Sequence, residues 1–384
     1  MRHHNSVFHG LLKHVPWATF ERLVDRHDAD RRVRRLTTRS QLVALLYGQF
    51  AGAASLREIE GALASHRGRL YHLGAAPAAR STLADANARR PAEVFAGLFA
   101  AMVAQASRGL RRQVGEAVRL VDATSLRLAG PASEWARFSA AACGAKVHVV
   151  YDPDADRPLY AAVTTARTGD VTAARDMPVE AGATYVFDLG YYDYAWWGRL
   201  HDAGCRIVTR LKVNTPLTSV EERATPGGGA VLSDRVGLLP ARQARSRKNP
   251  FGARVREVRV TIETGKTLRI LTNDLDAPAQ EIADLYKRRW AIELFFRWVK
   301  QTLRIKSFLG LSENAVRIQV AVALIAFLLL RLAADAARSA EPPLAFARLV
   351  RANIMHRRPI DTLRHPPPTV IHDPRQLAFN GLET

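Results

Sequence analysis

The pattern of hydrophobic and polar residues divides the chain into regions of different period. In residues 1–112, apolar residues such as Leu56 and Ile59 recur three or four positions apart, which is typical of short amphipathic helices. Ser55 lies before Leu56 and Glu58 follows it three positions later, which predicts a capping box at the start of a helix. We therefore expect the N-terminal region to be entirely helical.

From about residue 113 the period shortens to that of β-strands. Short apolar or alternating runs follow one another and are separated by Pro, Gly and acidic residues. The strands expected here are 118–121, 145–151, 159–163, 185–187 and 207–211, with a helix that includes residues 194–200. Neighbouring strands followed by a strand–helix–strand unit predict a mixed α/β sheet in residues 113–212.

Residues 213–276 differ from the sheet before them. Three glycines, Gly227–Gly229, break the chain, and residues 255–262 alternate strongly between apolar and polar. The basic stretch of this region comprises Arg242, Arg245, Arg247 and Lys248. We interpret residues 213–276 as a β-rich insertion in the α/β core.

Two long helices are expected after the insertion. One begins near Pro278 and ends at about Leu303, and the other spans residues 312–336. The second is apolar almost all round, which is typical of a helix buried in a core. Residues 277–340 would thus complete the α/β core, and residues 341–384 would form a peripheral C-terminal arm.

The charge balance favours a polyanionic partner. The 384 residues include 56 Lys plus Arg and 36 Asp plus Glu, a formal net charge of +20, which favours nucleic acid or an anionic membrane surface. The longest apolar run, residues 320–330, is too short to cross a bilayer. Two cysteines are too few for a disulfide framework or a cysteine zinc site. We expect a cytoplasmic protein that binds nucleic acid and has no membrane partner.

The helix expected over residues 278–303 carries a stripe of charge. At about 100° per residue, four side chains fall within about 60° of arc; they are Tyr286, Arg289, Glu293 and Lys300. Arg297 and Trp290 flank this stripe, and a neighbouring face is apolar. One interpretation is an ordinary helix with an ion pair between Arg289 and Glu293. The other is a surface for a phosphodiester beside a metal-binding carboxylate, because one acid stands among several cations.

The spacing Tyr-x2-Arg-x3-Glu-x6-Lys, formed by those four residues, resembles the YREK motif of DDE transposases encoded by bacterial insertion sequences. Residues 120–124, Leu-Val-Asp-Ala-Thr, are similar to the first catalytic strand of that family. Residues 186–192, with their Asp-x-Gly-Tyr step, resemble the second. The resemblance covers about residues 115–335 and is strongest to the branch that carries a β-strand insertion.

The resemblance implies a ribonuclease-H-like core in which Asp122, Asp188 and Glu293 form a catalytic, metal-binding triad. Carboxylates suit two Mg²⁺ ions, which prefer hard oxygen ligands, and Mn²⁺ is expected to substitute. It also implies contacts to DNA phosphates, for which the candidates are Tyr286, Arg289, Lys300 and Arg297. No nucleotide cofactor is expected, because the Gly227–Gly229 run lacks the Lys-Ser or Lys-Thr of a P-loop.

By the same resemblance we expect a transposase that binds the terminal inverted repeats of its element, cleaves double-stranded DNA with Mg²⁺ and joins the freed end to a target. Relatives with the β insertion often excise their element through a hairpin intermediate. A homodimer assembled on DNA, in the cytoplasm at the nucleoid, fits this function, with residues 1–112 as the DNA-binding domain. The alternatives are a catalytically inactive DNA-binding regulator and a structure-specific nuclease on the same core.

Several other residues are weaker site candidates. Lys146, Arg210 and Asn273 lie on or next to expected strands, and His148 fits a histidine on the surface of the sheet better than a catalytic group. Trp290 either packs at the helix edge or stacks on an unpaired base. The basic run at residues 31–35 fits a solvated loop and a phosphate contact equally well.

Overall fold

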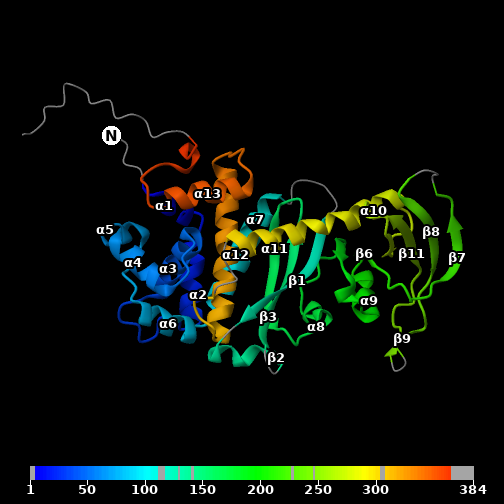
Figure 1. Ribbon diagram of the computed structural model, residues 1–384, viewed down its shortest axis with the longest axis horizontal. Coiled ribbons are helices and arrows are strands. Elements are labelled where there is room, and N and C mark those ends of the chain that lie inside the picture. Colours follow the sequence, from blue (N-terminus) through cyan, green and yellow to red (C-terminus); the bar gives the residue numbers. More distant parts are fainter. Residues whose placement is uncertain are drawn as a thin grey trace, which may run out of the picture.

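The computed structural model describes residues 5–110, 117–128, 130–139, 142–225, 229–244, 247–302 and 308–364 (Figure 1). It is a mixed α/β fold with a helical N-terminal region, as the sequence predicts. Parts of some expectations lie outside the described residues: the start of the core at residue 113, Gly227 and Gly228 of the triple glycine, Arg245, Leu303, and the C-terminal arm beyond residue 364.

The N-terminal region consists of helices packed around buried apolar residues. Its elements are α1 (Val7–Leu12), α2 (Trp17–Arg26), α3 (Thr38–Ala51), α4 (Leu56–Ser65), α5 (Arg67–Leu70), the 3₁₀ helix η1 (Tyr71–Leu73), α6 (Arg80–Arg89) and α7 (Ala92–Leu110). The Ser55 cap is confirmed at the start of α4, but the return bond of the expected capping box goes to the residue before Ser55. The Ser55 hydroxyl accepts a hydrogen bond from the Glu58 N–H at 3.2 Å, and the Glu58 carboxylate accepts one from the Ala54 N–H at 2.8 Å.

Replacing Ser55 by alanine is expected to lower the free energy of unfolding by about 1 kcal/mol, because the Glu58 N–H loses its acceptor. Chemical denaturation of the full chain measures the change. Ser65→Ala at the other end of α4 is the control, since the Ser65 hydroxyl only donates to the Ala62 carbonyl at 2.8 Å. A Ser55→Ala variant as stable as the wild type would contradict the capping role.

The described strands form one large mixed sheet and a separate two-stranded hairpin. The core strands are β1 (Val118–Leu128), β2 (Arg137–Ser139), β3 (Ala142–Asp152), β4 (Arg157–Thr165), β5 (Thr184–Phe187) and β6 (Arg206–Arg210). Within the sheet, the order β4–β3–β1–β5–β6 has β3 antiparallel to its neighbours and β5 and β6 parallel to β1. This is the strand order of a ribonuclease-H-like core, as predicted.

Short helices connect these strands. They are η2 (Pro131–Ala136), α8 (Asp170–Arg175), η3 (Leu189–Tyr191) and α9 (Tyr194–Asp202). An aromatic cluster joins α9 to β5. It includes Phe187 at the end of β5 and, on α9, Trp196 and the fully buried Trp197. This cluster supports the end of β5, where the chain turns at Asp188.

The insertion is β-rich, as predicted, but it extends the core sheet instead of forming a separate layer. Its elements are β7 (Thr218–Arg223), β8 (Val231–Leu238), β9 (Arg242–Ala244), β10 (Arg247–Lys248), β11 (Val255–Thr261) and β12 (Thr267–Thr272). β12 pairs antiparallel with β6, and the sheet then continues through β11 and β8 to β7. The otherwise unpaired backbone groups at the β6 edge are thereby satisfied.

The last part of the chain is helical and joins the two halves of the molecule. It contains α10 (Ala279–Arg288), α11 (Trp290–Thr302), α12 (Glu313–Ala336), α13 (Pro343–Asn353) and η4 (Ile360–Thr362). α12 packs against α3, α6 and α7 on one side and against β4 and α11 on the other (Figure 1). One apolar core therefore runs from the N-terminal helices to the sheet. The boundaries 1–112, 113–212, 213–276, 277–340 and 341–384 stay predictions.

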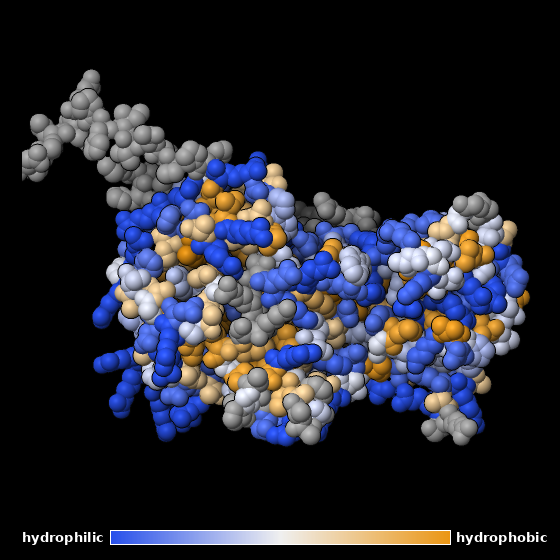
Figure 2. Space-filling view, viewed as in Figure 1, coloured by the Kyte–Doolittle hydropathy of each residue, from blue (hydrophilic) through white to orange (hydrophobic). Residues whose placement is uncertain are grey.

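α12 is the one helix in the described residues that is long and apolar enough to cross a membrane. Of its most apolar 18-residue window, 83% is buried inside the fold, so it is a core helix, as predicted. Hydrophilic residues dominate the face shown in Figure 2, and long hydrophilic side chains project from the N-terminal helices at its left.

Candidate active site

Asp122 and Asp188 lie level with each other on neighbouring strands. β1 and β5 pair in parallel up to Val121 and Phe187; Asp122 is the next residue of β1, and Asp188 is the first residue after β5. The expectation that Asp122 ends its strand is wrong, because β1 continues to Leu128. It continues because β3 pairs with β1 along its whole second half, so only the β5 partner stops at this point.

The Asp188 side chain is held by the turn that it starts. Its Oδ1 accepts a hydrogen bond from the Gly190 N–H at 2.8 Å and caps η3. Gly190 is needed for a close approach. A Cβ placed there would lie 3.0 Å from Asp188 Oδ1 and 3.0 Å from Asp170 Oδ2, so a larger residue would push one of the two carboxylates aside.

The helix that carries Glu293 differs from the single helix expected over residues 278–303. It is divided into α10 and α11 at Arg289, where hydrogen bonds to the third preceding residue replace the α-helical pattern. The two segments follow one another along the sheet (Figure 1). The buried face is as expected among the described residues: Leu285, Ile292, Phe295, Phe296 and Val299. That face holds α11 against β1 and α12.

Arg289 connects the strand acid to the helix acid. Its Nη2 lies 2.6 Å from Glu293 Oε1 and its Nη1 lies 3.7 Å from Asp122 Oδ2. The three side chains are 18%, 31% and 17% exposed for Arg289, Glu293 and Asp122. Two acids that are 171 positions apart in the sequence thus share one guanidinium. The ordinary i,i+4 pair that the sequence allows is present, but it is part of this larger contact.

The charges of Asp188 and Glu293 both act on the pKa of Asp122. The pKa of Asp122 is raised to about 6, chiefly because the carboxyl is buried, and the charges of Asp188 and Glu293 raise it further. The Ala123 N–H, which donates to Asp122 Oδ1 at 2.7 Å, and the Arg289 guanidinium oppose this shift. Asp122 is therefore ionised at neutral pH at an energetic cost, which a cation would relieve.

The remaining residues of the motif line the same helix edge. Tyr286 is buried, and the Arg289 guanidinium carbon lies 5.8 Å from the centre of its ring. Lys300 lies farther along α11, beside Thr124 of β1 in a small cavity. Arg297 is exposed, and its guanidinium carbon lies 5.9 Å from the ring centre of Trp290, which is 51% exposed. Lys300, Arg297 and Trp290 are thus placed along one helix that begins next to the acids.

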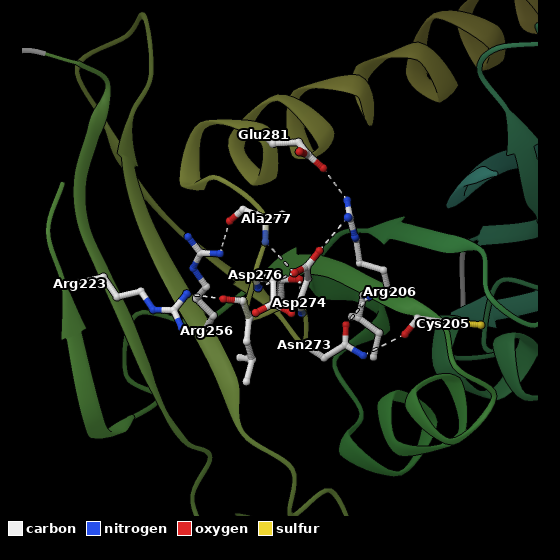
Figure 3. A network of polar contacts seen from close by, with 12 residues as sticks. Cys205, Arg206, Arg223, Arg256, Asn273, Asp274, Asp276, Ala277 and Glu281 are labelled. Carbon is white, nitrogen blue, oxygen red and sulfur yellow. Dashed lines mark hydrogen bonds and ion pairs between the residues drawn. The ribbon is translucent and has the colours of Figure 1, made fainter. Parts of the chain in front are cut away.

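A polar network fixes the start of α10 and with it the position of this helix (Figure 3). Arg206 at the start of β6 pairs with Asp274 at 2.7 Å and with Glu281 of α10 at 2.8 Å. Arg256 of β11 pairs with Asp234 at 2.7 Å and donates to the Ala277 carbonyl. The loop before α10 is therefore tied to both the core and the insertion.

Asn273 belongs to this structural network and not to the acids. Its Oδ1 accepts from the Ile207 N–H at 2.7 Å, and its Nδ2 lies 2.9 Å from both His201 Nδ1 and the Cys205 carbonyl (Figure 3). Its side-chain amide is thus used in holding β6 and α9 together. Arg210 ends β6 and, with Arg289, opposes the rise that burial causes in the pKa of Tyr286.

The structure adds one acid that the sequence reasoning did not select. Asp170, the first residue of α8, lies 3.0 Å from Lys146 Nζ and 3.8 Å from His148 Nδ1, and it approaches Asp188 across Gly190. His148 lies on the face of the sheet that α8 covers, and its side chain is fully buried. The signal in the sequence was the spacing of Lys146 and His148, two positions apart on β3. Two basic side chains on one face of a strand indicate an acidic partner nearby.

The chemistry of the three acids fits a hard divalent cation, because all of their donor atoms are carboxylate oxygens. Among the described residues, however, no three acidic, histidine or cysteine side chains are gathered into a group that could hold a metal ion as they stand. Arg289 occupies the position between Asp122 and Glu293.

The chain is similar to known transposases. Residues 114–329 match the transposase DDE domain family, and residues 3–76 match a domain of unknown function, DUF4372. The transposase y4zB of Sinorhizobium fredii is 42% identical over 290 residues, which are 74% of this chain and 80% of the relative. The transposase of the insertion sequence element IS5377 of Geobacillus stearothermophilus is 30% identical over 73% of this chain and 74% of its own length.

One solved structure is also similar in overall form. It is a cryo-EM structure of the piggyBac transposase synaptic complex with hairpin DNA, with a TM-score of 0.48 and 11% sequence identity over 95% of this chain and 83% of that chain. The family match covers more than half of the chain, including all three acids. The chain therefore belongs to the transposase DDE domain family and is a DNA-cleaving transposase of the kind that insertion sequences encode.

Proposed function

We propose that this transposase binds the terminal inverted repeats of an insertion sequence, cleaves the DNA strands at its ends and transfers the freed 3′ hydroxyl to a target. The observation that carries this proposal is the contact of Arg289 with Asp122 and Glu293. Through this contact Glu293 of α11 lies near Asp122 of β1, and the β1–β5 register sets Asp122 level with Asp188. The action would be cut-and-paste, by a homodimer assembled on the two DNA ends at the nucleoid.

Asp122, Asp188 and Glu293 are the residues that would hold two divalent ions, Mg²⁺ with Mn²⁺ as a substitute. When bound, such ions supply activation of the attacking oxygen and stabilisation of the leaving oxygen. The chain's own contribution is orientation. The β1–β5 register holds the two aspartates side by side, and the buried face of α11 holds Glu293 against them. The Arg289 guanidinium lies against Asp122 and Glu293 and offsets part of their negative charge.

The phosphate contacts proposed for Tyr286, Arg289, Lys300 and Arg297 follow from their places along one helix edge. Lys300 and Arg297 lie about two turns and one turn beyond Glu293, so a strand that follows α11 would meet cations in succession. A guanidinium binds a phosphate through a planar fork, and an ammonium binds it as a point charge. The assignment to the YREK branch rests on the spacing of these residues.

Arg297→Ala is expected to weaken binding of a DNA duplex several-fold and to reduce the slope of log affinity against log salt by about 1, since one phosphate contact is lost. Fluorescence anisotropy titrations between about 50 and 200 mM salt measure both quantities. Arg317→Ala is the control, because that exposed arginine already pairs with Glu313 at 2.6 Å. Equal salt slopes for the two variants would remove Arg297 from the DNA-binding surface.

A cleavage and joining assay tests the function as a whole. The purified chain is incubated with a duplex that carries the terminal repeat, a target plasmid and Mg²⁺, Mn²⁺ or Ca²⁺. Cleavage at the repeat end and joined product with Mg²⁺ support the proposal, and a hairpin on the released end would show as a slow band under denaturing conditions. Cleavage of branched DNA without joining would favour a structure-specific nuclease. Binding of the repeat without cleavage in any metal would favour a catalytically inactive regulator.

A further inference from the structure

A second charged group lies on the face of β3 opposite α11, because Val147 and Val149 face α11 and Lys146 and His148 alternate with them. Lys146 and His148 are two positions apart on β3, so their side chains lie on the same face of the sheet, which is the face that α8 covers. Asp170, at the start of α8, lies 3.0 Å from Lys146 Nζ and 3.8 Å from His148 Nδ1. The side chains of Asp170 and Lys146 are 24% and 21% exposed, and that of His148 is fully buried. This group is named the Asp170 cluster.

The Asp170 cluster approaches the candidate active site across one glycine. Asp170 Oδ2 and Asp188 Oδ1 each lie 3.0 Å from the position that a Cβ on Gly190 would occupy. The two carboxylate oxygens are therefore within the roughly 6 Å over which like charges act strongly on each other. Such proximity is unfavourable unless cations are also near.

Two buried polar atoms next to this group have no hydrogen-bond partner in the described part of the chain. They are the Tyr191 hydroxyl and His148 Nδ1, on residues that are 1% and 0% exposed. His148 Nε2 lies 2.9 Å from the Thr164 hydroxyl, and His148 Nδ1 faces Asp170 Oδ1 at 3.8 Å. Burial raises the pKa of Tyr191, and the charges of Asp170, Asp122 and Asp188 raise it further, which places the phenol among three aspartates.

The acids on the two faces of the sheet have separate cations. Arg289 contacts Asp122 and Glu293 on the α11 side, and Lys146 contacts Asp170 on the α8 side. Within the described residues, the Asp188 carboxylate accepts its hydrogen bond from the backbone N–H of Gly190. Its carboxylate is therefore exposed to the negative charge of Asp170, which Lys146 holds in place and partly neutralises.

We propose that Asp170 is a positioning residue for the transposase reaction: its charge, held by Lys146 beside Gly190, strengthens the binding of a divalent cation at Asp188. This inference rests on the proposed role of Asp188 as a metal ligand. Asp170 acts through the local potential and not by direct coordination. Groups behind the direct ligands commonly change metal affinity by one order of magnitude or more.

Substitutions of Asp170 and of Lys146 are expected to change the affinity for Mn²⁺ in opposite directions. Asp170→Asn removes a negative charge near the cation and should weaken Mn²⁺ binding about 5- to 10-fold. Lys146→Met removes a positive charge from the same place and should tighten Mn²⁺ binding about 2- to 5-fold. A cluster that only supports the fold would weaken binding in both variants.

The experiment titrates the full chain with Mn²⁺ alone and follows free Mn²⁺ by electron paramagnetic resonance. Asp176→Asn removes an exposed acid at the other end of α8 and is the matched control, expected to bind Mn²⁺ as the wild type does. Thermal melting of each variant is measured beside the titrations. In DNA cleavage, Asp170→Asn should raise the Mg²⁺ concentration for half-maximal rate by the same factor and leave the rate at saturating Mg²⁺ within about threefold.

The results separate this inference from the proposed function. If Asp188→Asn leaves Mn²⁺ binding unchanged, the proposed metal site itself is wrong. If Asp188→Asn weakens binding while Asp170→Asn does not, only the role of Asp170 fails. Weakened binding in both Asp170→Asn and Lys146→Met would also overturn the electrostatic role. Should Asp170→Asn fail to fold, the sign of the Lys146→Met effect decides the matter.

Discussion

Replacing Asp122 by asparagine is expected to abolish DNA cleavage and, at the same time, to stabilise the folded protein. The loss of cleavage should be on the order of 10³-fold or more, because a carboxylate that holds the cation is removed. The asparagine Oδ1 can still accept the Ala123 N–H that Asp122 accepts at 2.7 Å, so the strand should keep its form. Binding of the terminal-repeat duplex should be unchanged.

The gain in stability follows from the raised pKa of Asp122. Burial, then Asp188 and Glu293, raise this pKa to about 6, against the opposing effects of Ala123 and Arg289. The folded state therefore holds the proton more tightly than the unfolded state, and ionisation lowers the free energy of unfolding as the pH rises from about 4 to about 6. Asparagine avoids this loss, so the variant should be more stable by about 2 kcal/mol above pH 6 and equally stable near pH 4.

Thermal melting across this pH range and a nicking assay with Mg²⁺ measure the two effects on one preparation. Asp202→Asn, at the exposed end of α9, is the control and should change neither. Cleavage by Asp122→Asn within tenfold of the wild type would remove Asp122 from the catalytic residues. A gain in stability that is the same at pH 4 and pH 8 would show that charge is not its cause.

A second large effect is expected in the insertion, where Glu257→Gln should lower the free energy of unfolding by about 3 kcal/mol. Glu257 is fully buried in β11 and accepts contacts from three arginines. Arg235 lies at 2.5 Å, Arg259 at 2.9 Å and Arg269 at 2.6 Å from its carboxylate. Loss of its charge leaves these guanidinium groups without their shared counterion.

The pH dependence of this effect has the opposite direction to that of Asp122. Burial alone would raise the pKa of Glu257, but hydrogen bonds from Arg269, Arg259 and Arg235 outweigh it and lower the pKa to about 2. Its stabilising contribution is therefore complete above about pH 4.5, the value of a free glutamate, and is lost as the pH falls towards 2. The difference between wild type and Glu257→Gln should shrink over that range.

Chemical denaturation at neutral and acidic pH tests this prediction. Glu222→Gln removes an exposed carboxylate from β7 in the same insertion and should cost less than about 0.5 kcal/mol. A Glu257→Gln variant as stable as Glu222→Gln would mean that the arginines find other partners. Proteolysis should first cut the insertion of Glu257→Gln, since Arg269 also donates to the Lys212 and Val213 carbonyls where the insertion begins.

Much of the local structure could be predicted from the sequence because it depends on short-range periodicity. The strand before Asp188, the helix cap at Ser55 and the buried helix from Ser312 all appear where the pattern predicts them. Errors arose where a long-range partner extends or interrupts an element. β1 continues past Asp122 because β3 pairs with it, and the helix divides at Arg289, whose side chain contacts both Asp122 and Glu293.

The sequence by itself determined which residues can share a face: Leu285, Ile292 and Phe295 on the buried side of one helix, and Glu293 with its cations beside them. Helical and strand periods follow from backbone geometry, so this information is local. Only the tertiary structure decided that Arg289 joins Glu293 to Asp122, that β12 adds the insertion to the β6 edge, and that Asp170 stands behind Asp188. Those contacts join residues far apart in the chain, and they form because backbone edges, charges and apolar faces must each find a partner when the whole chain packs.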